Sequence, residues 1–122
     1  MYRSIMQIYV KGSDKAIEFY QKAFDAKLGV CYSYENGTIK HAELDVYGQI
    51  LALSELLDND STTGNTMQLT LHFGRENEAL VQKIYDVLKE SANILYPLSK
   101  CPFSPLMTDL IDKYGIHWGI YV

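Results

Sequence analysis

The chain has 122 residues, of which 48% are hydrophobic and 21% charged, as in ordinary globular proteins, and it is long enough to bury one core. Its net charge of −4 and the lack of any run of lysine or arginine argue against a nucleic-acid or anionic-membrane partner, since both are bound by clustered basic side chains. No stretch approaches the roughly 18 consecutive apolar residues of a membrane-spanning helix, and the first residues lack the apolar block of a signal peptide. We therefore expect a cytoplasmic protein, with Cys31 and Cys101 as free thiols.

The first half of the chain alternates between strand and helix periodicities. Residues 2–10 alternate apolar and polar side chains as a strand does, and residues 15–24 repeat apolar side chains every three or four positions as an amphipathic helix does. Ser13 or Asp14 can cap the start of this helix. A second strand is expected over residues 28–34, and an Asn-Gly pair, typical of hairpin turns, leads into the third.

Residues 41–55 predict two strands joined by a two-residue turn at Tyr47-Gly48. With a turn of that length Leu44 lies opposite Leu51, and residues that oppose each other in an antiparallel pair share a face. The same register pairs Val46 with Gln49, Ala42 with Leu53, and Glu43 with Ala52. One face is then wholly apolar (Ala42, Leu44, Leu51 and Leu53), and the other is mostly polar (His41, Glu43, Asp45, Ile50, Ala52 and Ser54). The apolar face is expected to cover a core, and the polar face is expected to meet water or line a pocket.

Residues 58–65 are polar and turn-rich, and we expect them to form a linker. After them the pattern restarts with an alternating strand over residues 67–73, followed by a helix whose apolar stripe consists of Leu80, Val81, Ile84, Val87 and Leu88. Further strands are expected over residues 94–98, 106–112 and 116–122. Pro97 confines the first of these three to a sheet edge or a bulge, because proline cannot donate a hydrogen bond to a neighbouring strand.

Both halves have the order strand, helix, strand, strand, strand, which indicates an internal repeat. We expect one α+β domain made of modules 1–57 and 66–122. Each module offers one apolar sheet face to its helix, and the opposite faces carry Gln7, Tyr9, His41, Glu43, Ser54, Gln68, Thr70, His72, His117 and Tyr121. If the two sheets curve together, these residues line a hollow that can hold a small molecule.

Three segments resemble a known family: Asp14 to Tyr20 (DKAIEFY), His41 to Leu44 (HAEL) and Asp112 to Trp118 (DKYGIHW). They are similar to the PhnB-like branch of the vicinal oxygen chelate superfamily, which has the glyoxalase, bleomycin-resistance and extradiol-dioxygenase fold. The resemblance covers nearly the whole chain in the right order. It implies paired βαβββ modules that form an open cup with the helices outside, usually in homodimers. Members include metal-dependent lyases, isomerases, epimerases and dioxygenases, and also antibiotic-sequestering proteins without catalysis, so this fold does not determine the function.

The resemblance also indicates where a metal would bind. Metal-using members take mostly His and Glu ligands from the first and last strands of each module. The corresponding positions here are Ile5, Ala52, Gln68 and Gly119 or, after a two-residue slip, Gln7, Ser54, Thr70 and Tyr121. None of these is His, Asp, Glu or Cys, and amides and hydroxyls bind divalent transition ions weakly. We therefore expect no metal and no other cofactor at the usual site, while a displaced site drawn from His41, Glu43, His72 and His117 stays open.

The histidines have two interpretations each. His41 and Glu43 lie two apart on one strand face and can act as a base and its orienting carboxylate, but we favour a structural hydrogen bond from His41 to Ser54. His72 can be a pocket acid–base group or can cap the start of the second helix region. His117 can face the pocket or the surface.

Two tyrosines and one loop are the remaining candidates. Tyr9 and Tyr121, on the first and last strands, offer aromatic walls with hydroxyl tips and are the preferred ligand contacts. The segment Lys100–Pro105 contains two prolines and is expected to be a loop, either over the mouth of the cup or as a rigid connection. Phe103 lies in it where the resemblance would place a tryptophan. Cys101 is expected to be a spectator thiol, because nothing in the sequence lowers its pKa.

The sequence thus predicts a metal-independent protein that binds a small organic molecule in the cup, with contacts from Gln7, Tyr9, Ser54, Thr70, His72 and Tyr121. If a reaction is catalysed, His41, Glu43 and His72 are the candidate catalytic residues. The alternative is a metal-dependent lyase, isomerase or dioxygenase that uses the displaced ligand set. A third interpretation is a filled hollow, with the modules serving only in assembly.

Overall fold

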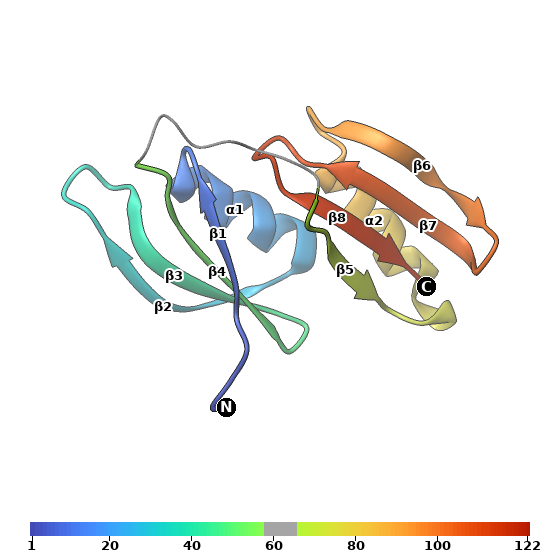
Figure 1. Ribbon diagram of the computed structural model, residues 1–122, viewed down its shortest axis with the longest axis horizontal. Coiled ribbons are helices and arrows are strands. Elements are labelled where there is room, and N and C mark those ends of the chain that lie inside the picture. Colours follow the sequence, from blue (N-terminus) through green and yellow to red (C-terminus); the bar gives the residue numbers. More distant parts are fainter. Residues whose placement is uncertain (58–65) are drawn as a thin grey trace. The chain divides into compact units, whose positions relative to one another are not determined.

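A computed structural model of the chain describes residues 1–57 and 66–122, and each of these two ranges forms one compact unit (Figure 1). The expected linker 58–65 lies outside the described residues. In the described ranges, α1 (Ser13–Phe24) and α2 (Glu78–Leu88) are too short and too polar to cross a bilayer.

Each unit contains one helix and one four-stranded mixed sheet, as expected for an α+β fold. The first unit has the elements β1 (Met6–Val10), α1, β2 (Lys27–Ser33), β3 (Ile39–Val46) and β4 (Gln49–Glu55). The second has β5 (Leu69–His72), a short 3-10 helix (Arg75–Asn77), α2, β6 (Asn93–Cys101), β7 (Ser104–Ile111) and β8 (His117–Tyr121). The strand orders are β1-β4-β3-β2 and β5-β8-β7-β6, so the first and last strands of each unit pair in parallel and the others pair antiparallel. The two units thus have the same topology.

The predicted β3–β4 hairpin is confirmed in its register. Val46 pairs with Gln49 and Leu44 with Leu51, which leaves a two-residue turn at Tyr47-Gly48. Both turn residues have positive φ, 51° for Tyr47 and 92° for Gly48, as the tightest hairpin turns require. The predicted apolar face is fully buried at Ala42, Leu44, Leu51 and Leu53.

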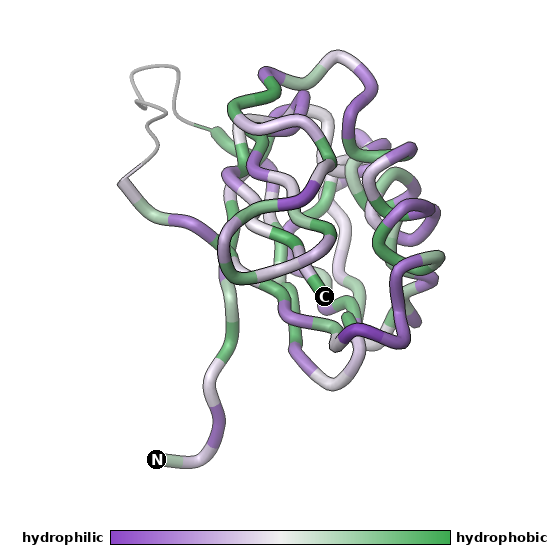
Figure 2. Tube along the Cα trace, turned by 90° about the vertical axis from the view of Figure 1, so that its right-hand side faces the viewer, coloured by the Kyte–Doolittle hydropathy of each residue, from purple (hydrophilic) through white to green (hydrophobic). Residues whose placement is uncertain are grey.

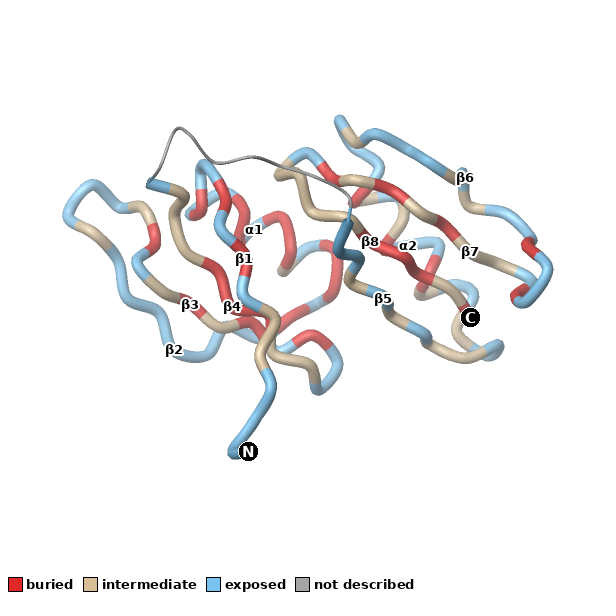
Figure 3. The backbone as a smooth tube through the Cα atoms, viewed as in Figure 1, coloured by how far each residue is buried: buried red, intermediate tan, exposed pale blue. Residues whose placement is uncertain are grey.

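Each helix covers the apolar face of its own sheet: α1 contacts β1, β3 and β4, and α2 contacts β7. The edge strands β2 and β6 are mostly exposed (Figure 3). The buried residues of α1 are Ser13, Ala16, Ile17, Phe19, Tyr20, Ala23 and Phe24, and those of α2 are Val81, Ile84 and Leu88. Figure 2 shows hydrophilic and hydrophobic residues alternating along the helices, the pattern of a helix with one face in a core. The predicted stripe of α1 is therefore core, and that of α2 is core at Val81, Ile84 and Leu88, whereas Leu80 and Val87 are only half-buried.

The predicted cap of α1 is wrong. Neither Ser13 nor Asp14 caps the helix, because Gly12 is the N-cap residue and the helix begins at Ser13 itself. Glu55 at the end of β4 performs this role from outside the helix: its carboxylate accepts hydrogen bonds from the Ser13 N–H (2.9 Å), the Ser13 hydroxyl (2.8 Å) and the Gly12 N–H (3.2 Å). Partial burial by itself raises the pKa of Glu55, but the hydrogen bonds from Ser13 and Gly12 outweigh it and lower the pKa. A carboxylate at this end also complements the positive end of the helix dipole.

Several boundaries differ from the expectation. The first strand starts at Met6 rather than near residue 2. The strand expected over residues 94–98 is β6, which runs on to Cys101, and the segment Lys100–Pro105 is a hairpin turn at Pro102-Phe103 rather than a loop. Pro97 does lie on an edge strand with an irregular register, as predicted.

Residues 112–116 make the turn between β7 and β8. The side chain of Asp112 is buried and accepts hydrogen bonds from the backbone N–H groups of Tyr114 (2.8 Å) and Ile116 (3.1 Å) through one oxygen. Its other oxygen accepts a hydrogen bond from the indole N–H of the buried Trp118 (2.8 Å). This carboxylate therefore fixes both the turn and the largest core side chain of the second unit.

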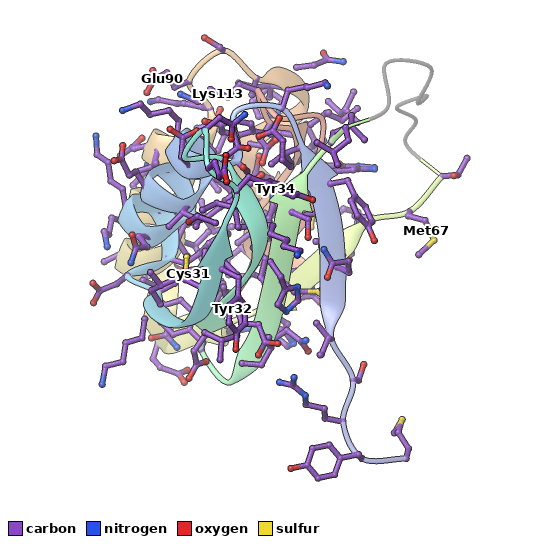
Figure 4. The ribbon with its side chains drawn as sticks, turned by 90° about the vertical axis from the view of Figure 1, so that its left-hand side faces the viewer. Cys31, Tyr32, Tyr34, Met67, Glu90 and Lys113 are labelled. Carbon is purple, nitrogen blue, oxygen red and sulfur yellow. The ribbon has the colours of Figure 1, made fainter. Side chains whose placement is uncertain are left out.

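Strand β2 is an open edge of the first sheet. Every residue from Lys27 to Ser33 is exposed, including the apolar side chains of Leu28, Val30 and Tyr32. Figure 4 shows Cys31 and Tyr32 on this strand. Cys31 is an exposed free thiol and Cys101 a buried one, in agreement with the prediction.

Candidate functional site

In each unit the sheet face opposite the helix carries the polar side chains. In the first sheet Gln7 pairs with Ala52, and Tyr9 with Ser54. In the second sheet Thr70 pairs with Gly119, and His72 with Tyr121. The predicted contact residues thus belong to two sets, Gln7, Tyr9 and Ser54 in the first unit and Thr70, His72 and Tyr121 in the second. We call these two surfaces the first and second polar faces.

On the first polar face the favoured hydrogen bond from His41 to Ser54 is not formed. Ser54 accepts a hydrogen bond from the amide of Gln7 instead (3.2 Å), and His41 Nε2 lies 3.1 Å from Glu43 Oε2. Sequence reasoning missed Arg3, whose guanidinium donates to both oxygens of Glu43 at 2.9 and 3.0 Å. His41 and Glu43, considered above as a base and its orienting carboxylate, therefore belong to a cluster of three residues. In this cluster Arg3 already binds both oxygens of the Glu43 carboxylate.

The Arg3 cluster makes Glu43 unusually acidic. The hydrogen bonds from Arg3 and then from His41 lower the pKa of Glu43 to about 2 from the ordinary value of 4.5. Because the pKa is lowered in the folded chain, the ion pair contributes its full stability above about pH 4.5 and loses it as the pH falls toward 2.

We predict that the substitution Arg3→Gln raises the pKa of Glu43 back toward the ordinary range, because the largest cause of the shift is the Arg3 hydrogen bond. A carbon-13 NMR titration of the glutamate carboxyl groups measures this directly. The matched control is Lys15→Gln, which removes a cation that pairs with Glu18. If the pKa of Glu43 is the same in wild type and Arg3→Gln, the assigned cluster is wrong.

On the second polar face three rings lie together. The rings of His72 and Tyr121 are stacked, with centroids 4.4 Å apart and planes within 12°. Phe103, at the tip of the β6–β7 hairpin, meets Tyr121 edge-on at 5.3 Å and is 63% exposed. His72 therefore joins an aromatic cluster and does not cap the second helix region, where Gly74 and Asn77 stand at the helix starts without side-chain caps.

A polar cluster lies on the same face. His117 Nε2 is 2.5 Å from Asp109 Oδ1 and 3.3 Å from the amide nitrogen of Gln68. Thr70 donates a hydrogen bond to the amide oxygen of Gln68 (2.9 Å). Sequence reasoning missed Asp109, because its strand alternates poorly: Thr108 faces the core and Met107 faces the polar side. His117 faces this cluster rather than open solvent, since its side chain is 10% exposed.

The positions that the resemblance assigns to metal ligands do not suit a metal. Ala52 and Gly119 are buried and offer no donor atom, and a Cβ added at Gly119 would lie 2.8 Å from the amide group of Gln68. Within residues 1–57 and 66–122, no group of three or more His, Cys, Asp or Glu side chains could hold a metal ion. His41 and Glu43 do lie together, whereas His72 belongs to the aromatic cluster and His117 to the Asp109 cluster.

We predict that Gly119→Ala displaces the Gln68 amide at little cost to stability, less than about 1 kcal/mol, because the crowded atoms are the end of a flexible exposed side chain. The displacement should shift the side-chain NMR resonances of Gln68 and His117, while unfolding in urea changes little. A loss of several kcal/mol would show that Gln68 cannot move aside.

Among the sequence comparisons, no family model and no curated protein matches the chain. Several solved structures do match the chain. The chain is similar to the PhnB protein from Bacillus cereus, with 24% identity over 98% of each chain and a TM-score of 0.85. It is similar to PA1353 from Pseudomonas aeruginosa, with 15% identity over 99% of this chain and 97% of that one and a TM-score of 0.83. The fosfomycin resistance protein FosX from Listeria monocytogenes is 12% identical, with 98% and 91% covered and a TM-score of 0.71. At these identities the likeness shows the fold alone.

Proposed function

Because the chain has the vicinal oxygen chelate fold that its sequence resemblance predicted, we propose that it binds a small organic molecule on the polar faces of its sheets, without a metal cofactor. Gln7, Tyr9 and Ser54 supply the contacts on the first polar face. Thr70, His72 and Tyr121 supply those on the second.

The aromatic cluster on the second polar face carries this proposal. Stacked rings next to hydroxyl, amide and carboxylate groups combine apolar contact area with a few directional polar groups, which is the usual composition of a small-molecule site. Phe103 is 63% exposed beside this cluster, and Tyr9 on the first polar face is 61% exposed. Rings left this open on a face that no helix of their own unit covers are available to stack on a ligand.

Saturation-transfer NMR with a panel of small aromatic and heteroaromatic fragments tests the proposal. We expect fragments to bind the wild-type chain and to bind Tyr121→Ala much more weakly, since the substitution removes the middle ring of the cluster. Tyr85→Ala is the matched control, because Tyr85 lies on α2, which covers the opposite face of the second sheet. The proposal fails if no fragment binds, or if both substitutions reduce binding equally.

The alternative of a metal-dependent lyase, isomerase or dioxygenase draws support from one contact, the approach of His41 to Glu43 at 3.1 Å. A FosX structure that this chain resembles was determined in complex with Mn(II). Here, however, Arg3 donates to both oxygens of Glu43, so an ion would have to displace a bidentate guanidinium.

Metal binding separates the two functions. Purified without a histidine tag, the protein is dialysed against Mn(II) or Zn(II), and the bound metal is measured. Our proposal predicts no stoichiometric metal. One metal ion per chain that is lost in Glu43→Gln would establish the alternative.

We also propose that the chain works as a homodimer in the cytoplasm. The exposed edge strand β2, with the apolar side chains of Leu28, Val30 and Tyr32, supports self-association, because open edges pair readily with other strands. Light scattering during size-exclusion chromatography should give twice the chain mass. A monomer at every accessible concentration would contradict this assembly.

A further inference from the structure

The pairing of Asp109 with His117 on the second polar face has an unusual pattern of exposure. The side chain of His117 is 10% exposed and that of Asp109 is 30% exposed, so the imidazole lies beneath and the carboxylate faces outward. In this arrangement the group that a ligand can reach is the carboxylate. The imidazole holds it in place.

The short contact also determines which ring nitrogen carries the hydrogen. Asp109 is an acceptor, so His117 Nε2 must donate across the 2.5 Å that separates it from Asp109 Oδ1. The Gln68 amide nitrogen, 3.3 Å from the same Nε2, is then a neighbour of this hydrogen bond and does not donate to the ring. The other ring nitrogen, Nδ1, is buried and has no hydrogen-bond partner among the described residues. In a neutral His117 ring, Nδ1 carries only a lone pair. In a charged ring, Nδ1 would carry a hydrogen that is buried without an acceptor, which is unfavourable.

The side chain of Asp109 stays 30% exposed between the two strands that flank β7. Directly across on β8 lies Gly119, and the Gln68 amide takes the space that a side chain at this position would fill. On the other side β6 places Tyr96, whose hydroxyl donates to the carbonyl oxygen of Lys100. In the part of the chain that the structure describes, Asp109 Oδ2 has no hydrogen-bond partner, and the Gln68 amide and Thr70 hydroxyl lie beside the same cluster.

We propose that Asp109, held by His117, binds a cationic group of the ligand, of the ammonium or guanidinium class. With the ring neutral, the pair carries one negative charge, and a partly exposed carboxylate oxygen accepts most strongly from a charged donor. Asp109 thus gives the second polar face a preference for positively charged groups. None of the other contact residues on this face supplies such a preference. The inference rests on the proposed function, since it names the chemistry of a group bound on the same face.

The test uses methylguanidinium as the probe and N-methylurea as its uncharged counterpart, each added to the full chain at about pH 8, above the ordinary titration range of histidine. Amide resonances are followed by two-dimensional proton–nitrogen NMR. We expect methylguanidinium to cause saturable shifts in β7 and β8 and N-methylurea to cause much smaller ones. Asp109→Asn should weaken methylguanidinium binding about tenfold or more, the effect of a lost charged hydrogen bond. The control Asp86→Asn, on the exposed side of α2, should leave it unchanged.

A second measurement needs no substitution in the site. The side-chain nitrogen resonances of His117 in the wild-type chain should show hydrogen on Nε2, and the Nε2 resonance should move as methylguanidinium saturates, because a cation on Oδ2 weakens the hydrogen bond at Oδ1. The inference is overturned if methylguanidinium leaves β7 and β8 unshifted, if Asp109→Asn binds as wild type does, or if N-methylurea binds equally well. Aromatic fragments that bind through Tyr121 while these tests fail would leave the proposed function intact and remove only this inference.

Discussion

Replacing Leu51 with alanine is expected to lower the free energy of unfolding by about 3 kcal/mol, within the roughly 2–5 kcal/mol typical of buried leucines. Leu51 is fully buried and lies directly opposite Leu44, also fully buried, in the core of the first unit. The loss combines the transfer free energy of the removed methyl groups with the cavity that they leave. Urea unfolding of the full chain measures it.

The neighbouring residue provides the control. Ile50 lies on the opposite face of the same strand and is only half-buried, so Ile50→Ala should cost about 1 kcal/mol. A one-residue slip of the hairpin would exchange the two faces. An Ile50→Ala loss equal to or greater than the Leu51→Ala loss would therefore contradict the assigned register.

Replacing Asp112 with alanine is expected to destabilise the second unit by about 3–5 kcal/mol. The substitution leaves the indole N–H of Trp118 buried without an acceptor and removes the acceptor of two backbone N–H groups in the β7–β8 turn. Urea or thermal unfolding monitored by the fluorescence of Trp118, the single tryptophan of the chain, reports this loss directly.

Asp112→Asn separates the two roles of this carboxylate. An asparagine keeps an oxygen for the turn but turns an NH₂ group toward Trp118, so we expect a loss of about 1–2 kcal/mol. In a Trp118→Phe background the donor is gone, and the further cost of Asp112→Asn should fall close to zero. Equal costs in both backgrounds would show that the hydrogen bond between Asp112 and Trp118 does not stabilise the fold.

Sequence periodicity was sufficient to predict the helices and strands that have one continuous apolar face. The β3–β4 register followed from the alternation of Leu44 and Leu51 with polar neighbours and from a two-residue turn containing Gly48, which adopts a positive φ. The helices followed from apolar repeats such as Val81, Ile84 and Leu88. In these segments local geometry and burial favour the same structure, so the pattern is unambiguous.

The polar contacts could not be predicted in the same way, because they join residues far apart in the sequence. Arg3 lies outside any strand and reaches Glu43 forty residues away. Glu55 accepts the hydrogen bonds at the start of α1 from the end of β4, far away in the sequence. The local sequence therefore pointed to Ser13 as the cap. Asp109 was not predicted as a polar-face residue, because β7 does not alternate as expected. In β7 the polar Thr108 is buried in the core, and the apolar Met107 faces the polar side. A proline on each side of Phe103 suggested a loop, although Ser104 begins a strand and its hydroxyl donates to the carbonyl oxygen of Val122.

Among the predicted contact residues, the structure brings Gln7 together with Ser54 and His72 together with Tyr121. Period-two alternation identified the correct face for all of them, because side chains two apart on a strand point the same way. Which of them touch depended on register between strands β1 and β4 and between β5 and β8, which are paired in parallel and far apart in the sequence. Their role in binding stays a prediction.

Mapping a bound fragment onto the assigned amide spectrum tests the central claim most directly. The account predicts that a fragment which binds the wild-type chain causes its largest saturable shifts at the polar-face residues Thr70, His72 and Tyr121, with little change along α2. Shifts concentrated on α2 or on the open edge of β2, with these three residues unmoved, would contradict it.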